Sequence, residues 1–217
     1  MLAEVLDRII AYAASDEASL LAAQKEWAEL AGRVFDDDPL YEERATAFLE
    51  WFALDRVGGR EGRVEGVGRR PVERFLASER LSDLEGSWAF ALARSHRALF
   101  ELVEKLDGEV LVADLLGRAQ FQVTERRRLP GLADGDVFEA RIIANIATPP
   151  QLLFSRAFQF HPREAARVIK RRVRALGAEG ASRDDILFRF AHLRWKAQRW
   201  AHVPAEQIYD GTGPDEP

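Results

Sequence analysis

One carboxylate in this sequence lies where a charged group is unusual. Asp55 follows the stretch FLEWFAL, and on a helical wheel it falls between Phe48 and Trp51, on the aromatic side of a helix over about 40–55. It also lies near the C-terminus of that helix, where the helix dipole disfavours negative charge. A carboxylate in such a place needs a cation or several hydrogen-bond donors.

Two roles are open for Asp55. We expect Asp55 to form a structural ion pair with an arginine. Glu50 is expected on the narrow exposed edge of the same helix. The alternative is a ligand-binding or catalytic site formed by Asp55 and Trp51. Three arginines are candidate partners in the ion pair: Arg56, Arg70 and Arg74.

The other residues that could do chemistry form no recognised arrangement. The four histidines are His96, His161, His192 and His202. None belongs to an H-E-x-x-H motif, and no G-x-S-x-G motif occurs. The lack of cysteine excludes disulfides, thiolate zinc sites and a cysteine nucleophile. We assign no catalytic residue, no metal ligand and no cofactor; a non-enzymatic protein is favoured, and an enzyme stays the alternative.

A second candidate site is a basic helix over residues 163–174. Its candidate binding residues are Arg163, Arg167, Lys170, Arg171, Arg172 and Arg174. Arginine arrays bind backbone phosphates, so the helix makes nucleic-acid binding possible. The low pI of about 5.5 and the lack of a nucleic-acid motif count against it. Three aromatic residues of the neighbouring strands are expected in the core rather than as stacking platforms: Phe121, Phe138 and Phe158.

The net charge of −5 conceals an uneven distribution. Residues 1–55 hold 13 acidic and 4 basic residues, whereas residues 126–200 hold 7 acidic and 16 basic residues. Such asymmetry marks either an interaction surface or two segments that pack against each other. We favour the second interpretation; a dimer that joins an acidic to a basic half is the other.

Apolar periodicity predicts helices over residues 2–13, 16–34 and 40–55. Asp36–Asp38 are expected to cap the third helix. The glycine-rich segment 58–68 has neither the Walker nor the dinucleotide pattern and is interpreted as a linker. Pro71 begins a short helix, PVERFLAS, and Ser82 with Glu85 forms a capping box for the next.

The period then changes from helical to alternating. Strands are predicted from LFELVEKL and EVLVADLL, joined by an Asp107–Gly108 turn, and from AQFQVTE and VFEARIIANI. QLLFSRAFQF is a fifth candidate. Two helices follow, the basic one after His161–Pro162 and one over about 183–201 that carries Trp195 and Trp200. The last stretch, YDGTGPDEP, is expected to be a frayed tail.

These elements predict an α+β protein. We expect an N-terminal helical bundle (1–98), a small antiparallel β-barrel or meander (99–160) and two C-terminal helices (161–217), together one compact unit. No run of about 18 apolar residues occurs, so no membrane span is expected. The first segment looks like an amphipathic helix rather than a secretory signal, which makes the cytoplasm the expected location.

The order of FLEWFALDR, RPVERFLAS, EVLVADLLG and LADGDVFEARII resembles a largely uncharacterised bacterial family. Its members have an F-x-x-W-F-x-x-D helix followed by a small β-sheet, and some carry a SEC-C zinc motif, which is absent from this cysteine-free chain. The resemblance covers about residues 48–145 and implies an architecture rather than catalytic residues. The uneven charge, the glycine-rich segment and the lack of a catalytic motif allow non-enzymatic binding through protein–protein contacts, with an unknown partner or a second copy of the chain, and this is the expected function.

Overall fold

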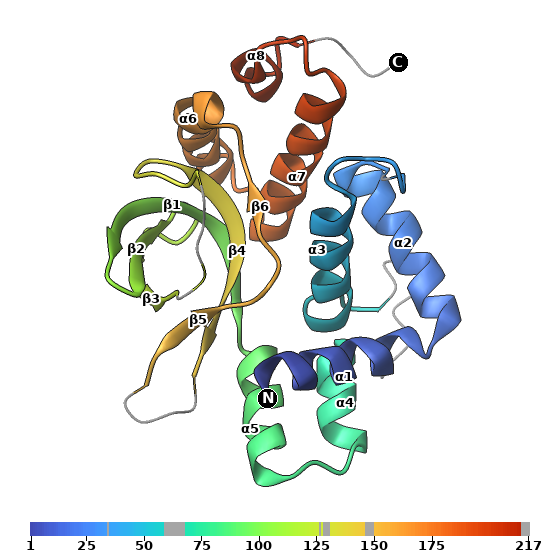
Figure 1. Ribbon diagram of the computed structural model, residues 1–217. Coiled ribbons are helices and arrows are strands. Elements are labelled where there is room, and N and C mark those ends of the chain that lie inside the picture. Colours follow the sequence, from blue (N-terminus) through green and yellow to red (C-terminus); the bar gives the residue numbers. More distant parts are fainter. Residues whose placement is uncertain (34, 59–67, 126, 128–130, 146–149, 214–217) are drawn as a thin grey trace.

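The computed structural model describes residues 1–33, 35–58, 68–125, 127, 131–145 and 150–213. N-terminal helices, a β-barrel and C-terminal helices pack against one another (Figure 1). The predicted α+β fold is confirmed. The first strand begins at His96, inside the segment 1–98 that we expected to be helical. None of the described helices combines the length and the apolar character needed to cross a bilayer.

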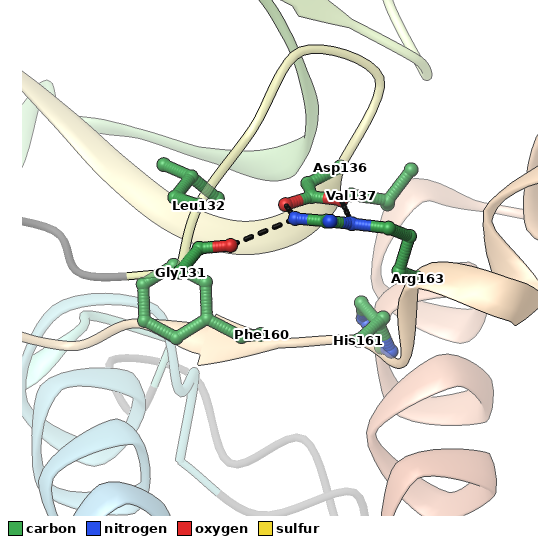
Figure 2. Close-up of a pocket in the computed structure, with 7 residues that line it drawn as sticks. All are labelled: Gly131, Leu132, Asp136, Val137, Phe160, His161 and Arg163. Atoms are coloured by element: carbon green, nitrogen blue, oxygen red, sulfur yellow. Dashed lines mark hydrogen bonds and ion pairs between the residues drawn. The ribbon is translucent and has the colours of Figure 1, made fainter.

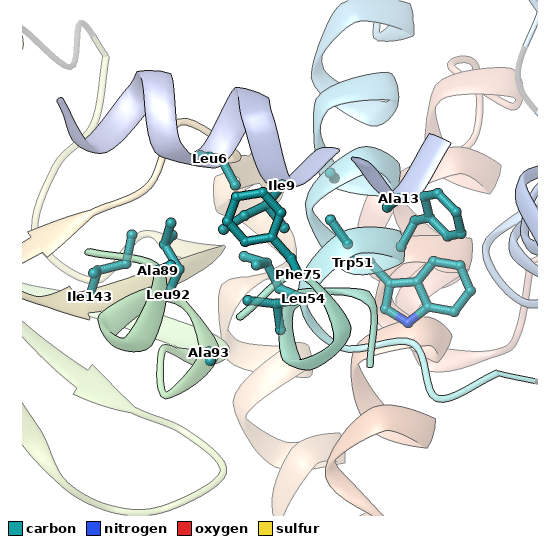
Figure 3. Close-up of a cluster of buried hydrophobic side chains, with 14 of the residues drawn as sticks. Leu6, Ile9, Ala13, Trp51, Leu54, Phe75, Ala89, Leu92, Ala93 and Ile143 are labelled. Carbon is teal, nitrogen blue, oxygen red and sulfur yellow. The ribbon is translucent and has the colours of Figure 1, made fainter. Parts of the chain in front are cut away.

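Five helices form the N-terminal group, close to the predicted positions: α1 (Leu2–Ala14), α2 (Glu17–Ala31), α3 (Tyr41–Leu54), α4 (Pro71–Ser78) and α5 (Asp83–Ala93). Their apolar faces meet in one core, in which Ile9 of α1 and Phe75 of α4 are buried (Figure 3). Ile143 from the barrel and Phe188 from a C-terminal helix belong to the same core. The three parts of the chain therefore share apolar packing.

Side-chain caps are found at the starts of α2 and α5. Asp16 accepts a hydrogen bond from the backbone of Ser19, and Ser82 forms the predicted capping box with Glu85. The prediction for Asp36–Asp38 is wrong, because α3 starts after Leu40 without a side-chain cap. Asp38 instead accepts the backbone N–H of Phe35 at 2.9 Å. Most of the predicted glycine-rich linker, residues 59–67, lies outside the described residues.

Five strands close a barrel in the order β1-β2-β3-β5-β4-β1, with β6 beside β4. Their bounds are β1 (His96–Leu106), β2 (Glu109–Asp114), β3 (Gln120–Thr124), β4 (Val137–Ala144), β5 (Leu152–Phe154) and β6 (Gln159–Phe160). The first half of β1 pairs with β4 and the second half with β2, and Gly108 takes a positive φ of 72° in the β1–β2 turn. The barrel is mixed rather than wholly antiparallel, because β3 and β5 pair in parallel. QLLFSRAFQF forms two short strands, not one.

The barrel interior is aromatic. Phe138 and Phe158 are buried there, and the partly buried Phe121 packs against the same cluster through Phe100. The prediction that these rings belong to the core is confirmed. They are therefore not stacking platforms on an open face.

The C-terminal part is more structured than expected. It contains a 3₁₀ turn (Arg163–Ala165), α6 (Ala166–Ala178), α7 (Arg183–Arg199) and α8 (Ala205–Asp210). The prediction of a frayed tail from Tyr209 is wrong at its start, because α8 buries Ile208 and Tyr209 completely or nearly so. The Tyr209 hydroxyl forms a 2.7 Å hydrogen bond with Nδ1 of His161. Aromatic and apolar contacts thus hold α8 where the polar composition predicted disorder.

Candidate functional site

Asp55 is the C-cap of α3, and its carboxylate is held by Arg141 of β4. Both terminal nitrogens of Arg141 take part, one of them at 3.1 Å, and the same guanidinium donates to the Ser95 hydroxyl at 2.9 Å. The predicted structural ion pair is confirmed. The predicted partners are wrong: Arg56 pairs with Glu26, and Arg70 pairs with Glu73.

The Asp55–Arg141 pair is part of a buried layer of charges between α3 and the outer face of β1 and β4. We call this layer the polar seam; it comprises Glu50, Asp55, Arg97, Glu139, Arg141 and Gln159. Glu50 is only 2% exposed, so its predicted place on an exposed edge is wrong. It accepts the backbone N–H of Ala157 at 3.2 Å and lies 3.5 Å from Nε of Arg141.

Strand pairing explains how the cations of the seam come together. Arg97 of β1 is directly opposite Arg141 of β4, and both point out of the barrel towards α3. Arg97 donates to Glu139 at 2.7 Å, and its guanidinium lies over the rings of Trp27 and Phe188. Burial alone would lower the pKa of Arg141, but the negative charges of Asp55, Glu50 and Glu139 outweigh it and hold that pKa above the usual value.

The polar seam leaves no room for a substrate. The hollow lined by Glu50, Arg97, Glu139 and Arg141 has a volume of about 10 Å³. Ligand pockets usually measure about 300–1,000 Å³. Trp51, the second candidate residue beside Asp55, is 3% exposed and packs against Trp27 and Phe188 at 5.2 and 5.4 Å between ring centroids. The seam is therefore suited to joining α3 to the barrel rather than to catalysis.

A second buried polar group lies where α3, α7 and β6 meet. Burial raises the pKa of Glu43 to about 7, although Arg194 and Arg44 act in the opposite direction. Burial, together with the positive charge of Arg194, lowers the pKa of His161 to about 3, so that histidine is neutral in the folded protein. Glu43 is the group here whose charge changes near neutral pH.

The basic helix was the second candidate site, and about half of its charge is used inside the protein. Arg163 pairs with Asp136 at 2.7 Å and donates to the carbonyl of Gly131, beside a hollow of about 460 Å³ (Figure 2). Lys170 pairs with Glu101 at 2.8 Å, and Arg172 donates to the Tyr209 carbonyl at 2.7 Å.

Three arginines of α6 itself are exposed; Arg163, which is also exposed, lies in the 3₁₀ turn before α6. Arg167, Arg171 and Arg174 are exposed, and Arg171 pairs with the exposed Asp210 of α8. Within the described part of the chain, neither Arg167 nor Arg174 forms an ion pair or a side-chain hydrogen bond. Of the six candidate binding residues, Arg167, Arg171 and Arg174 are therefore the ones that α6 presents to solvent.

The outer face of β2 and β3 does not add a nucleic-acid-binding surface to the exposed arginines of α6. In oligonucleotide-binding barrels, strands 2 and 3 form much of the binding face. A fold alone does not decide function, so the side chains of this barrel must be compared with that use. The outward side chains of β2 and β3 include neither a cation nor an aromatic ring; they are Glu109, Leu111, Ala113, Gln120, Gln122 and Thr124.

The uneven charge distribution is explained by contacts within the molecule. Among the described residues, four ion pairs join the acidic segment 1–55 to the basic segment 126–200. They are Arg156–Asp7 at 2.7 Å, Arg199–Asp38 at 3.1 Å, Arg141–Glu50 at 3.5 Å and Arg141–Asp55. The interpretation that the two segments pack against each other is confirmed.

An open aromatic hollow lies at the end of α7, where the α2–α3 turn packs beside it (Figure 1). It has a volume of about 530 Å³. Two tryptophans, a histidine and a proline contribute most of its apolar lining, and none of them is fully buried. The lining residues are Asp38, Pro39, Trp195, Gln198, Arg199, Trp200 and His202.

Stacked arginines form the rim of this hollow. The guanidinium of Arg199 lies 4.9 Å from the ring centre of Phe35 and 5.4 Å from that of Trp195. Arg33 lies 5.0 Å from the same Phe35 ring, which is 41% exposed. We call this area the turn surface; it comprises Arg33, Phe35, Asp38, Pro39, Trp195, Arg199, Trp200 and His202.

Two local features fix the turn surface. Gly32 ends α2 with φ +87°, and a Cβ at that position would lie 2.6 Å from the Trp195 ring, so only glycine allows this approach. The buried side chain of Arg44 donates to the carbonyls of Ala31 and Gly32 at 2.7 and 2.9 Å. Charge-assisted bonds thus satisfy the last carbonyls of α2 and hold the turn against α3.

The sequence did not indicate this surface. Trp195 and Trp200 were expected only as residues of the last helix, and the turn that completes the hollow is far away in the chain. The only sequence signal is the close spacing of Trp195, Arg199 and Trp200 in WKAQRW. No protein-family model, curated protein or solved structure matches the chain. The resemblance to a bacterial family therefore stays a prediction.

Proposed function

We propose that this chain is a non-enzymatic binding protein that docks a segment of a partner protein on the turn surface. The observation that supports the proposal is the hollow of about 530 Å³ lined by Trp195, Trp200 and His202. Its size lies in the range of ligand sites, and its walls are aromatic with a few polar groups at the rim.

The residue types favour a protein partner. Tryptophan and arginine are enriched among residues that dominate binding energy at protein interfaces, whereas most exposed residues contribute little. Here both types occur together, and the side chains are already ordered by contacts within the molecule. Arg199 is held by Asp38 and by two rings, and Trp195 packs on Gly32. Ordered side chains lose less conformational entropy on binding than free ones.

An enzyme with a site at Asp55, the alternative from the sequence, has less support. Its carboxylate is paired with Arg141, and the adjacent hollow holds about 10 Å³.

The test is a selection of binders from a random peptide library displayed on phage, with the wild-type chain immobilised. Selected peptides are then measured against Trp200→Ala and His202→Ala by fluorescence anisotropy. We expect at least about a tenfold loss of affinity for Trp200→Ala, since truncating an interface tryptophan typically costs 2 kcal/mol or more. Phe90→Ala is the matched control, because Phe90 is an exposed aromatic residue (56%) on α5.

Two outcomes overturn the proposal. One is that the selection yields no binder; the other is that binders lose no affinity in Trp200→Ala and His202→Ala. Circular dichroism of each variant separates a lost contact from a lost fold. Light scattering adds the case of self-association: a dimer mass that falls to the monomer mass in Trp200→Ala identifies a second copy of the chain as the partner.

A further inference from the structure

The exposed arginines of α6 are separate from the turn surface. Arg167, Arg171 and Arg174 are at positions i, i+4 and i+7, which places them in one row along the helix. With a rise of about 1.5 Å per residue, the row spans about 10 Å. The opposite side of α6 is buried by Val168, Ile169 and Val173.

The row is only weakly neutralised by the protein itself. Arg171 pairs with Asp210, but the two side chains are 56% and 44% exposed. Exposed ion pairs contribute about 0–1 kcal/mol, so a competing anion readily replaces Asp210. Within the described residues, Arg167 and Arg174 have no acidic partner. All three guanidinium groups are thus available to an external anion.

The electrostatics of the neighbouring Arg172 show that positive charge is crowded here. Burial lowers its pKa, and the nearby charge of Arg189 on α7 lowers it further, as does that of Arg171. Asp210 and Glu179 act in the opposite direction but do not cancel this effect. A bound polyanion would relieve the repulsion.

We propose that Arg167, Arg171 and Arg174 bind the phosphate backbone of a nucleic acid without reading its bases. A row of guanidinium groups matches a chain of phosphates, because each one binds phosphate oxygens through a planar set of donors. The row has no aromatic or amide side chain for base contacts, and the outer face of β2 and β3 supplies none. A membrane surface fits less well, because the apolar side of α6 is already buried in the protein.

The test is fluorescence anisotropy with a labelled single-stranded RNA of mixed sequence, about 20 nucleotides long, at low and moderate salt. The affinity for single strands falls with salt by a slope of about −0.7 per phosphate contact, so three contacts predict about a 20-fold loss between about 50 and 200 mM salt. The triple variant Arg167→Gln/Arg171→Gln/Arg174→Gln is expected to lose at least about tenfold in affinity at low salt.

The control removes the same charge elsewhere. Arg69→Gln/Arg80→Gln/Arg94→Gln changes three other exposed arginines and is expected to stay within about twofold of wild type. Trp200→Ala is expected to bind RNA normally, because it lies on the turn surface. Three results overturn the proposal: no binding at low salt, equal losses in both triple variants, or binding to anionic lipid vesicles without binding to RNA.

Discussion

Arg141 on β4 holds the carboxylate of Asp55, at the end of α3, with both of its terminal nitrogens. Arg141 is 3% exposed and Asp55 is 19% exposed. Removing one partner of a buried pair leaves the other charge without compensation, which typically costs 3–5 kcal/mol. We therefore expect Arg141→Met to lower the free energy of unfolding by about 3–5 kcal/mol in urea denaturation.

The smaller substitution Asp55→Asn tests the same pair from the other side. Its cost should be lower, about 1–3 kcal/mol, because Asp55 is partly exposed and Arg141 keeps Glu50 at 3.5 Å. The double variant should cost less than the sum of the two single ones, as contacting residues couple. Arg171→Met, at an exposed pair, is the control. A cost for Arg141→Met as small as that of Arg171→Met would contradict the assigned role of the polar seam.

Glu43 should make the stability depend on pH near neutrality. Its pKa rises from 4.5 to about 7 on folding, so the folded state binds the proton more tightly. The resulting stabilisation is fully present below pH 4.5 and is lost as the pH rises through 7. Since one pKa unit corresponds to 1.36 kcal/mol, the loss is at most about 3 kcal/mol, reduced by partial exposure.

Glu43→Gln removes this titration. The free energy of unfolding of the variant minus that of wild type should therefore increase between pH 4.5 and 7, measured by urea denaturation at each pH. His161, with its pKa lowered to about 3, destabilises the fold as the pH falls below 6.5, but it does so equally in both proteins. A difference between Glu43→Gln and wild type that does not change with pH would rule out the raised pKa.

A feature of the fold or of a candidate site could be predicted from the sequence where residues close together in the chain determine it. The need of Asp55 for a cation follows from its position on one helix, and that prediction is correct. Its partner Arg141 is 86 positions away, and only the pairing of β1 with β4 turns Arg97 and Arg141 towards α3. Glu50 was misplaced for the same reason. A helical wheel shows that Glu50 is a polar residue on one side of α3, but it does not show that the charged outer face of β1 and β4 covers that side.

The end of the chain shows a second limit. Tyr209 and Asp210 begin the stretch YDGTGPDEP that was expected to fray, yet they belong to a helix, because Tyr209 packs against His161 and Phe190 in the folded protein. The turn surface shows a third limit. Arg199 and Asp38 are 161 positions apart, and a hollow formed by both has no local signature.

Gly32 links the fold to the turn surface. Gly32→Ala introduces a Cβ 2.6 Å from the Trp195 ring at a backbone φ of +87°. Strain of this kind costs about 1–3 kcal/mol, and the ring must also move. We expect a loss of stability of more than about 2 kcal/mol in urea denaturation, together with weaker binding of any Trp200-dependent peptide.

The matched control for Gly32→Ala is Gly86→Ala. Gly86 lies inside α5, and a Cβ there meets no atom within 4 Å. Alanine in a helix interior is favoured over glycine by about 0.5–1 kcal/mol, so this variant should be as stable as wild type or more so. If both alanine variants behave alike, the close approach of Gly32 to Trp195 does not determine the turn surface.

The hydrogen bond between the hydroxyl of Tyr209 and Nδ1 of His161 should anchor α8. Both side chains are buried, and the bond measures 2.7 Å. Tyr209→Phe keeps the ring and leaves the histidine nitrogen without its partner, which should lower the free energy of unfolding by about 1–3 kcal/mol in urea denaturation. Tyr12→Phe is the control, because the Tyr12 hydroxyl meets Ser78 at an exposed position and its loss should cost less than about 0.5 kcal/mol. Equal costs in the two variants would mean that the hydrogen bond between Tyr209 and His161 does not anchor α8.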